Sequence, residues 1–206
     1  MEAALRIAVP AAWAWALVAL LAQGIRARGY GRLEHFAAPA GNPLAGVLYA
    51  FGPGMSPAAK ESTREHLPAY FTGVGYHLGI FASLAWLALL LAGFQPGGVL
   101  LRSFQVLMLA GALCGAGLLV KRLVVPTLRG LSCPDDVLAN LLTTALAGLA
   151  FATTVQPAAA PWLLGEAVIL LVYLPLGKIR HCFFFFTTRY HMGSYYGRRG
   201  TFPPGA

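Results

Sequence analysis

Charged residues are scarce in this sequence. Asp, Glu, Lys and Arg make up 11% of its 206 residues, whereas soluble domains contain about 25%. Only seven residues are acidic, which leaves a net charge of +8 with histidine neutral. Cysteine is scarce as well: Cys114, Cys133 and Cys182 are far apart and form no CxxC pair. The sequence therefore excludes an ordinary water-soluble domain and predicts neither a disulfide framework nor a zinc site.

Long apolar runs are abundant instead, since 58% of the residues are hydrophobic. A transmembrane helix needs about 20 mostly apolar residues to cross the hydrocarbon layer. Five stretches meet this requirement, at residues 3–24, 67–94, 103–125, 137–155 and 162–186. Backbone in lipid must satisfy its hydrogen bonds within the chain, so residues 1–206 are expected to form one all-α membrane bundle of five transmembrane helices.

The positive charges are distributed unevenly about these spans. Thirteen of the fifteen Lys and Arg residues lie in the loop of residues 25–66, at the end of the third span and in the loop after it (Lys121, Arg122 and Arg129), or from residue 178 onward. Cytoplasmic segments carry such an excess. We therefore expect the N-terminus outside and the tail of residues 187–206 in the cytoplasm of a bacterium or archaeon. Membrane orientation accounts for the basic excess, so no nucleic-acid partner is predicted.

The first span is expected to be a retained anchor helix, because its positive charges follow the apolar run and no clear cleavage site appears. The loop of residues 25–66 is rich in proline and glycine. We expect little regular structure there apart from one short interfacial helix around residues 44–51. Together with the tail, this loop makes the cytoplasmic face the expected docking side for a partner.

Two histidines fall inside predicted spans, where an ionisable or coordinating residue is a functional candidate by default. His77 lies about ten residues into the second span, and His181 a little over one turn before the end of the fifth. Both are expected at similar depth in the cytoplasmic half of the membrane. Two facing imidazoles indicate one shared ligand, and histidine is a common axial ligand of haem iron in helical bundles.

Glycines surround His77 at positions 73, 75 and 79. Their missing side chains would leave room for a flat macrocycle close to the backbone. The alternative is that Gly73, Gly75 and Gly79 serve close helix packing, as small residues generally do in membranes, and that the histidines only hydrogen-bond to other helices. Spacing alone leaves both interpretations open.

Several short runs resemble one family. They are residues 76–80 (YHLGI), Lys121-Arg122, Arg129, residues 136–138 (DVL) and residues 175–181 (PLGKIRH). These resemble the gamma-subunit family of respiratory nitrate reductase, which includes cytochrome b subunits of sulfite-reductase-linked and heterodisulfide-reductase-like membrane complexes. Residues 54–68 are similar to the sulfate-reducer branch. The resemblance implies five helices, haem b, quinone chemistry and a cytoplasmic iron–sulfur or molybdenum partner subunit.

One departure from the family concerns the number of haems. Nitrate reductase gamma subunits carry two, each held by one histidine from the second helix and one from the fifth, and His77 and His181 match the cytoplasmic pair. At the positions of the outer pair this sequence has Leu87 and Leu163. Leucine cannot ligate iron, so a single haem b is predicted.

Other residues are assigned weaker roles. Haem propionates are anionic, so Arg180, Lys178, Arg122 and Lys121 are candidates to pair with them; alternatively these cations only set topology and reach the headgroups. His66 is a candidate for a propionate hydrogen bond or for capping the second span, although a plain interfacial histidine is the simpler interpretation. His191 is assigned to partner contact and His35 to a solvated loop.

Glu166 is the only carboxylate well inside a predicted span. Its position in the outer third of the fifth span suits a proton acceptor for quinol, because membrane proton relays commonly use Asp or Glu. The alternative is an interfacial glutamate that reaches water. The whole pattern predicts a haem-containing subunit that passes electrons between the quinone pool and a cytoplasmic oxidoreductase, without catalysis of its own except quinone chemistry; a haem-free anchor subunit is the rival interpretation.

Overall fold

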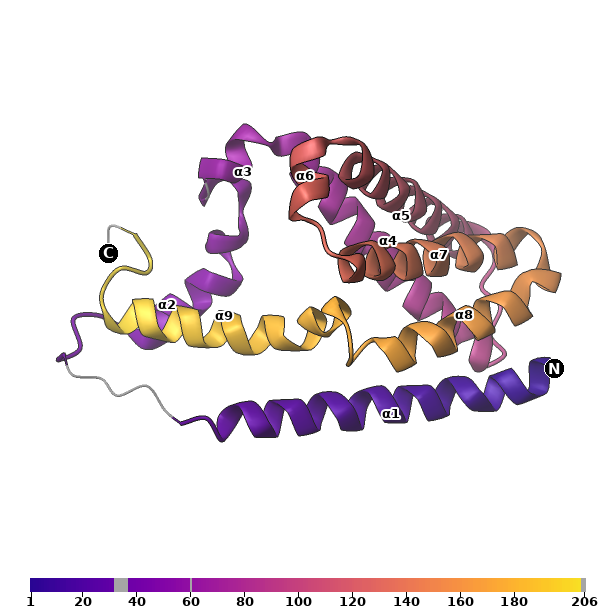
Figure 1. Cartoon of the computed structure of the whole chain (residues 1–206), viewed down its shortest axis with the longest axis horizontal. Coiled ribbons are helices and arrows are strands. Elements are labelled where there is room, and N and C mark those ends of the chain that lie inside the picture. Colours follow the sequence, from indigo (N-terminus) through magenta and orange to yellow (C-terminus); the bar gives the residue numbers. More distant parts are fainter. Residues whose placement is uncertain (32–36, 60, 205–206) are drawn as a thin grey trace. The chain divides into compact units, whose positions relative to one another are not determined.

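A computed structural model describes residues 1–31, 37–59 and 61–204, and this part of the chain contains helices and no strand (Figure 1). The α-helices are α1 (Glu2–Arg28), α2 (Pro43–Phe51), α3 (Glu61–Glu65), α4 (Leu67–Leu91), α5 (Gly98–Val124), α6 (Pro126–Leu131), α7 (Pro134–Val155), α8 (Ala160–Tyr173) and α9 (His181–Arg198). Short 3-10 turns occupy Pro53–Met55, Pro57–Ala59, Pro157–Ala159 and Lys178–Arg180. The predicted all-α class is confirmed.

Four helices are long and apolar enough to cross a membrane: α1, α4, α5 and α7. They correspond to the first four predicted spans, with ends that differ by at most five residues. The short helix expected around residues 44–51 is also confirmed, as α2. The remainder of the loop is more regular than expected, because two 3-10 turns and α3 follow α2. His35 lies outside the described residues.

The fifth span is wrong as a single helix of residues 162–186. Helix α8 ends at Tyr173 and α9 begins only at His181, so the pair qualifies as a span only if both are counted together across the break. The cause is Pro175, which has no N–H to donate and whose ring would meet the carbonyl of Leu171 in a continuing helix. At 14 residues, α8 alone rises about 21 Å, too little to cross about 30 Å of hydrocarbon.

The chain forms two compact units, which we call the first unit (Met1–Val18 and Pro68–Ile179) and the second unit (Ala19–Leu67 and Arg180–Ala206). The core of the first unit draws on α1, α4, α5, α7 and α8, with Val9, Met108, Leu146 and Leu164 fully buried. The part of α1 up to Val18 is therefore integral to this unit. The Trp15 indole N–H, which donates to the carbonyl of Val172 at 3.2 Å, adds a polar tie between α1 and α8.

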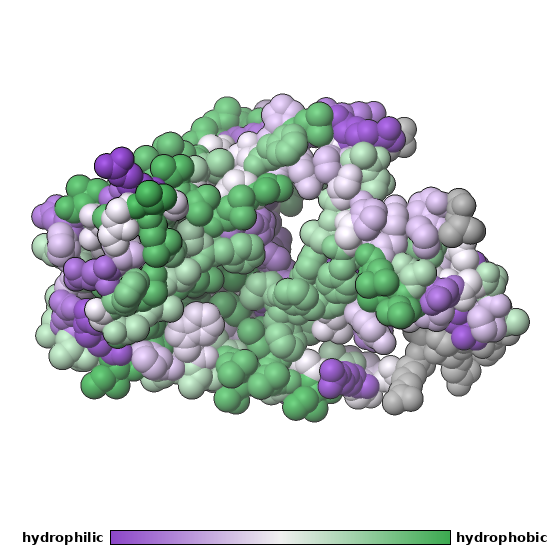
Figure 2. Space-filling view, turned by 180° about the vertical axis from the view of Figure 1, so that it is seen from behind, coloured by the Kyte–Doolittle hydropathy of each residue, from purple (hydrophilic) through white to green (hydrophobic). Residues whose placement is uncertain are grey.

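Apolar side chains also cover much of the outer surface, as the hydrophobic colouring of Figure 2 shows. On α4 and α5, Phe81, Val106 and Leu113 are 61%, 66% and 65% exposed. A soluble monomer rarely exposes such contiguous apolar area. These helices therefore have the surface of membrane spans, buried by their neighbours on one side and left to lipid on the other.

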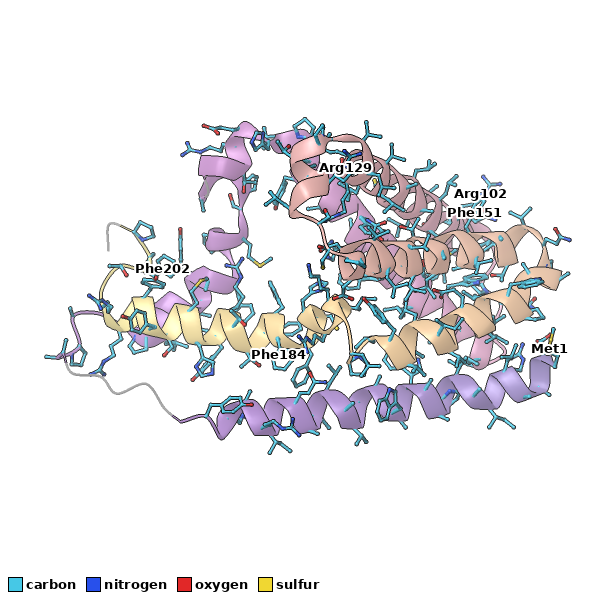
Figure 3. All side chains as sticks on the ribbon, in the orientation of Figure 1. Met1, Arg102, Arg129, Phe151, Phe184 and Phe202 are labelled. Atoms are coloured by element: carbon cyan, nitrogen blue, oxygen red, sulfur yellow. The ribbon has the colours of Figure 1, made fainter. Side chains whose placement is uncertain are left out.

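The second unit is built on the pair of α2 and α9, which lie side by side in Figure 1. Glycines make the closest contacts: a Cβ placed on Gly46 would overlap the backbone of Gly193 and Gly197. The N–H groups of Ala40 and Gly41 donate to the carbonyl of Arg198 at 2.9 and 3.0 Å and fix the chain before α2. Phe202, labelled in Figure 3, closes this end of the pair against Tyr49, with ring centroids 4.9 Å apart.

Candidate functional site

His77 lies on α4 with its ring exposed on the helix surface. Its Nδ1 is 2.7 Å from the carbonyl oxygen of Gly73, one turn earlier, so Nδ1 carries the proton and donates it. Nε2 is then the nitrogen with a lone pair for a ligand. Metal-binding histidines almost always donate their other ring N–H in this way, to a backbone carbonyl or a carboxylate. His77 therefore fits the role of an axial haem ligand.

The three glycines around His77 have different surroundings. A Cβ on Gly79 would overlap the backbone of Gly111 on α5, so Gly79 serves close helix packing. A Cβ on Gly75 would lie 3.3 Å from the Cys114 sulfur, whereas one on Gly73 would meet nothing within 4 Å. Helix packing therefore accounts for the glycine at position 79. Gly73, whose carbonyl accepts the hydrogen bond from His77, is the one of the three with open space around it.

Tyr76 fixes the orientation of α4, and sequence reasoning gave it no role. Its hydroxyl lies 2.9 Å from the carbonyl oxygen of Asn140 and 2.9 Å from the hydroxyl of Thr144, both on α7. Gly115 of α5 makes space for the Tyr76 ring. Because Tyr76 is buried towards α7, the adjacent His77 is directed to the outside of the bundle. Asn140 and Thr144, polar residues at i and i+4 within a predicted span, were the available signal.

His181 is the first residue of α9 and belongs to the second unit. Its expected position, one turn before the end of a continuous fifth span, is therefore wrong. The break at residues 174–177 also interrupts the helical phase between Leu163 and His181, so these two residues do not share the face of one helix. His181 is exposed, and Arg180 occupies the preceding N-cap position.

Leu87 and Leu163 occupy the positions that match the outer haem ligands of the family. Both are fully packed in the core of the first unit, with 1% and 0% of their surface exposed. The space around these positions is filled by side chains of the bundle itself. The number of haems stays a prediction.

Two of the four cations proposed for the propionates, Lys178 and Arg122, have partners within the first unit. The Lys178 ammonium lies 2.7 Å from Asp136 Oδ1, and the Arg122 guanidinium lies 3.7 Å from the same oxygen. The Tyr173 hydroxyl donates to the neighbouring Asp135. The cluster holds as many carboxylates as cations, so a propionate binding here would compete with Asp136 for Lys178.

Glu166 lies on α8 in the first unit, beside the fully buried Ala167. Both carboxylate oxygens are inaccessible, and no hydrogen-bond partner for them is found among the described residues. The alternative of an interfacial glutamate that reaches water is therefore wrong in this structure. An unpaired buried carboxylate is costly to keep charged, which suits a group that exchanges a proton.

A pocket of about 360 Å³ opens at the end of the first unit where α4 and α7 end and α5 and α8 begin. Its lining includes Arg6, Trp86, Gln95, Leu101, Thr153 and Thr154. The Trp86 indole N–H donates to the Thr153 hydroxyl at 2.7 Å, and Arg6 forms an ion pair with Glu2 at 3.0 Å. Aromatic side chains such as Trp86, with a few polar groups beside them, typically line small-molecule sites.

His66 and His191 lie in the second unit. His66 stands in the turn between α3 and α4, where its N–H donates to the carbonyl of Thr63 at 3.1 Å. His191 is exposed on α9. Within the described ranges, no three His, Cys, Asp or Glu side chains form a metal-binding group.

The described residues define an all-helical protein in which four helices are able to span a membrane, with a fifth span if α8 and α9 are counted together. No family model matches the chain, and neither a curated protein nor a solved structure is significantly similar to it. The resemblance to cytochrome b subunits therefore stays a prediction that depends on the residues quoted above.

Proposed function

We propose that this protein is a haem b-containing membrane subunit of a respiratory oxidoreductase in a bacterial or archaeal cytoplasmic membrane. It transfers electrons between the quinone pool and a cytoplasmic iron–sulfur or molybdenum subunit through one haem. The observation that carries the proposal is the hydrogen bond from His77 Nδ1 to the Gly73 carbonyl, because it assigns the ring proton to Nδ1 and the lone pair to Nε2. A ligating histidine requires this arrangement.

His77 and His181 would hold the haem iron, and the bound haem would supply reversible one-electron transfer. Gly73 would keep the face beside His77 clear, since nothing lies within 4 Å of its absent Cβ. Arg180, Lys178, Arg122 and His66 would meet the propionates. Of these, Lys178 and Arg122 would first have to share their contact with Asp136.

Glu166 would accept a proton from quinol. Both carboxylate oxygens are inaccessible and have no partner among the described residues. Burial makes the charged form costly, so the ionised Glu166 would readily take up a proton from quinol. The pocket beside Trp86 and Thr153 lies in the same unit and has room for a quinone ring. A quinone oxygen would find a hydrogen-bond donor there in the Gln95 amide, whereas the Thr154 hydroxyl already donates to the carbonyl of Phe151.

The proposal is tested by the absorption spectrum of the purified, dithionite-reduced protein. We expect a b-type α band and one haem per chain, measured as pyridine haemochrome against protein concentration. Leu87 and Leu163 are packed leucines, so there is no ligand pair for a second haem. A colourless protein would contradict the proposed function, and two haems per chain would contradict the single-haem prediction.

Glu166→Gln is expected to slow quinol oxidation about 100-fold while leaving haem content unchanged, because a general base contributes at least that factor. Glutamine keeps the shape of glutamate but cannot accept the proton. The matched control is Glu65→Gln, which removes an exposed carboxylate of α3 outside the pocket and outside α8. Both variants are assayed by stopped-flow reduction of the haem by a quinol analogue. Equal rates in Glu166→Gln and the unaltered protein would remove Glu166 from the proton path.

A haem-free membrane anchor for the same kind of complex is the second candidate function. The contact of Gly79 with Gly111 favours it, because packing alone explains that glycine. The reduced spectrum separates the two candidates.

A further inference from the structure

Helix α2 is apolar, short and covered on only one side. Its nine residues, Pro43–Phe51, include no charged side chain, and they rise only about 14 Å, too little to cross a bilayer. Leu44 and Leu48 are each 64% exposed. Phe51 is less exposed, at 37%, and its ring centroid lies 6.2 Å from that of Phe185 on α9. We call the Leu44 and Leu48 side chains the α2 stripe.

The partner of α2 in the second unit is α9, and the two meet through small residues. Gly46 and Ala50 of α2 face Gly193 and Gly197 of α9 so closely that a Cβ on Gly193 would lie 3.0 Å from that of Ala50. Small residues four apart on both helices are the packing device of helices in lipid, where burial of apolar surface gives no driving force. The pair is thus suited to a lipid environment.

The two outer faces of this pair differ in polarity. Leu44 and Leu48 are each two residues from Gly46, about 200° around α2, so the α2 stripe is directed away from α9. On α9, Thr188 and His191 are exposed and lie about 140–200° from Gly193. The second unit therefore exposes two leucines on the outer side of α2 and the polar side chains of Thr188 and His191 on the side of α9 that is turned away from α2.

Contacts within the second unit also place it beside the end of a membrane span. A Cβ on Gly24 of α1 would lie 3.0 Å from the ring of Phe183, in the first turn of α9. The next turn of α1 carries Arg26 and Arg28 and ends the helix. The aromatic start of α9 is therefore level with the point where α1 changes from apolar to basic, which is where a span leaves the hydrocarbon.

We propose that the second unit docks on anionic phospholipid, with the α2 stripe immersed among the headgroups and upper acyl chains of the leaflet where α1 ends. Basic charge complements this surface, since the described part of the unit contains seven arginines (Arg26, Arg28, Arg64, Arg180, Arg189, Arg198 and Arg199) against the two carboxylic residues Glu61 and Glu65. Apolar residues beside cations are what bind a short helix in the plane of a membrane. The inference does not depend on haem.

The test measures the depth of single spin labels in the full-length protein. Cys114, Cys133 and Cys182 are replaced by serine, and one nitroxide is attached at Leu48→Cys or, as the control, at Thr188→Cys. The proteins are reconstituted in vesicles of phosphatidylcholine with phosphatidylglycerol. Electron paramagnetic resonance then reports collisions with oxygen, which concentrates in lipid, and with a water-soluble nickel chelate.

We expect the oxygen-to-nickel collision ratio to be several-fold higher at position 48 than at position 188. The ratio at position 48 should also fall when phosphatidylglycerol is omitted. A label at position 48 that collides mainly with nickel places the α2 stripe in water and overturns the proposal. A label shielded from both reagents means that protein covers the stripe, which overturns it equally. Leu44→Cys repeats the measurement if Leu48→Cys does not fold.

Discussion

Replacing His77 with alanine is expected to abolish haem incorporation and leave the helical fold in place. The His77 ring is exposed on α4, so its removal leaves no internal cavity of the kind that destabilises a core. Replacing His181, which is exposed at the start of α9, should have the same effect. The measurements are haem per chain by pyridine haemochrome and helix content by circular dichroism.

Two control variants are matched to this experiment. His191→Ala removes an exposed imidazole from α9 that has no predicted contact with iron, so its haem content should not change. Leu87→Met tests the outer position with a change of similar volume, which usually costs less than about 1.5 kcal/mol. Leu87→Ala would be a poor control, because Leu87 is 1% exposed and a cavity there costs about 2–5 kcal/mol. Full haem content in His77→Ala would leave only the anchor function.

The positions of the first four spans could be predicted from composition alone. Lipid requires about 20 apolar residues per helix, and four such runs in the sequence each form one continuous helix. Pro10 lies inside α1, and the helix continues past it to Arg28. Hydropathy therefore locates these helices to within one turn or so.

The fifth span shows where hydropathy fails. Residues 162–186 are apolar throughout, and that average conceals Pro175 and Gly177. The N–H of Gly177 donates to the carbonyl of Tyr173 at 3.0 Å, which closes a turn, and a Cβ on Gly177 would overlap the Tyr173 ring. Proline followed two residues later by glycine is a helix-ending signal, and it moves His181 from the inside of a helix to the start of the next one.

The tertiary contacts of the site were only partly visible in the sequence. The sequence shows glycines at 73, 75 and 79 but not which of them faces another helix, because that depends on the crossing of α4 and α5. The GxxxG pair Gly193 and Gly197 was present as a signal for close packing. Its partners Gly46 and Ala50 are more than 140 residues away in the chain, and local patterns do not identify such pairings.

Gly79→Leu and Gly73→Leu are expected to have opposite effects, although the two glycines lie on the same helix within two turns. At Gly79 the added side chain would overlap the Gly111 backbone, which cannot move without moving α5. Overpacking costs about 1–3 kcal/mol and sometimes more, so Gly79→Leu should unfold at a markedly lower concentration of sodium dodecyl sulfate. Helix loss in mixed micelles, followed by circular dichroism, measures this change.

At Gly73 a Cβ meets nothing within 4 Å, so Gly73→Leu should unfold at the same detergent concentration as the unaltered protein. Its haem content should fall severely, because a leucine on the turn that His77 bonds would occupy the face left open for the macrocycle. Gly73→Ala, with a smaller side chain, should retain more haem than Gly73→Leu. If Gly73→Leu binds haem normally, the open space beside His77 is not the haem face. If Gly79→Leu is as stable as the unaltered protein, α4 and α5 do not cross at Gly79 and Gly111.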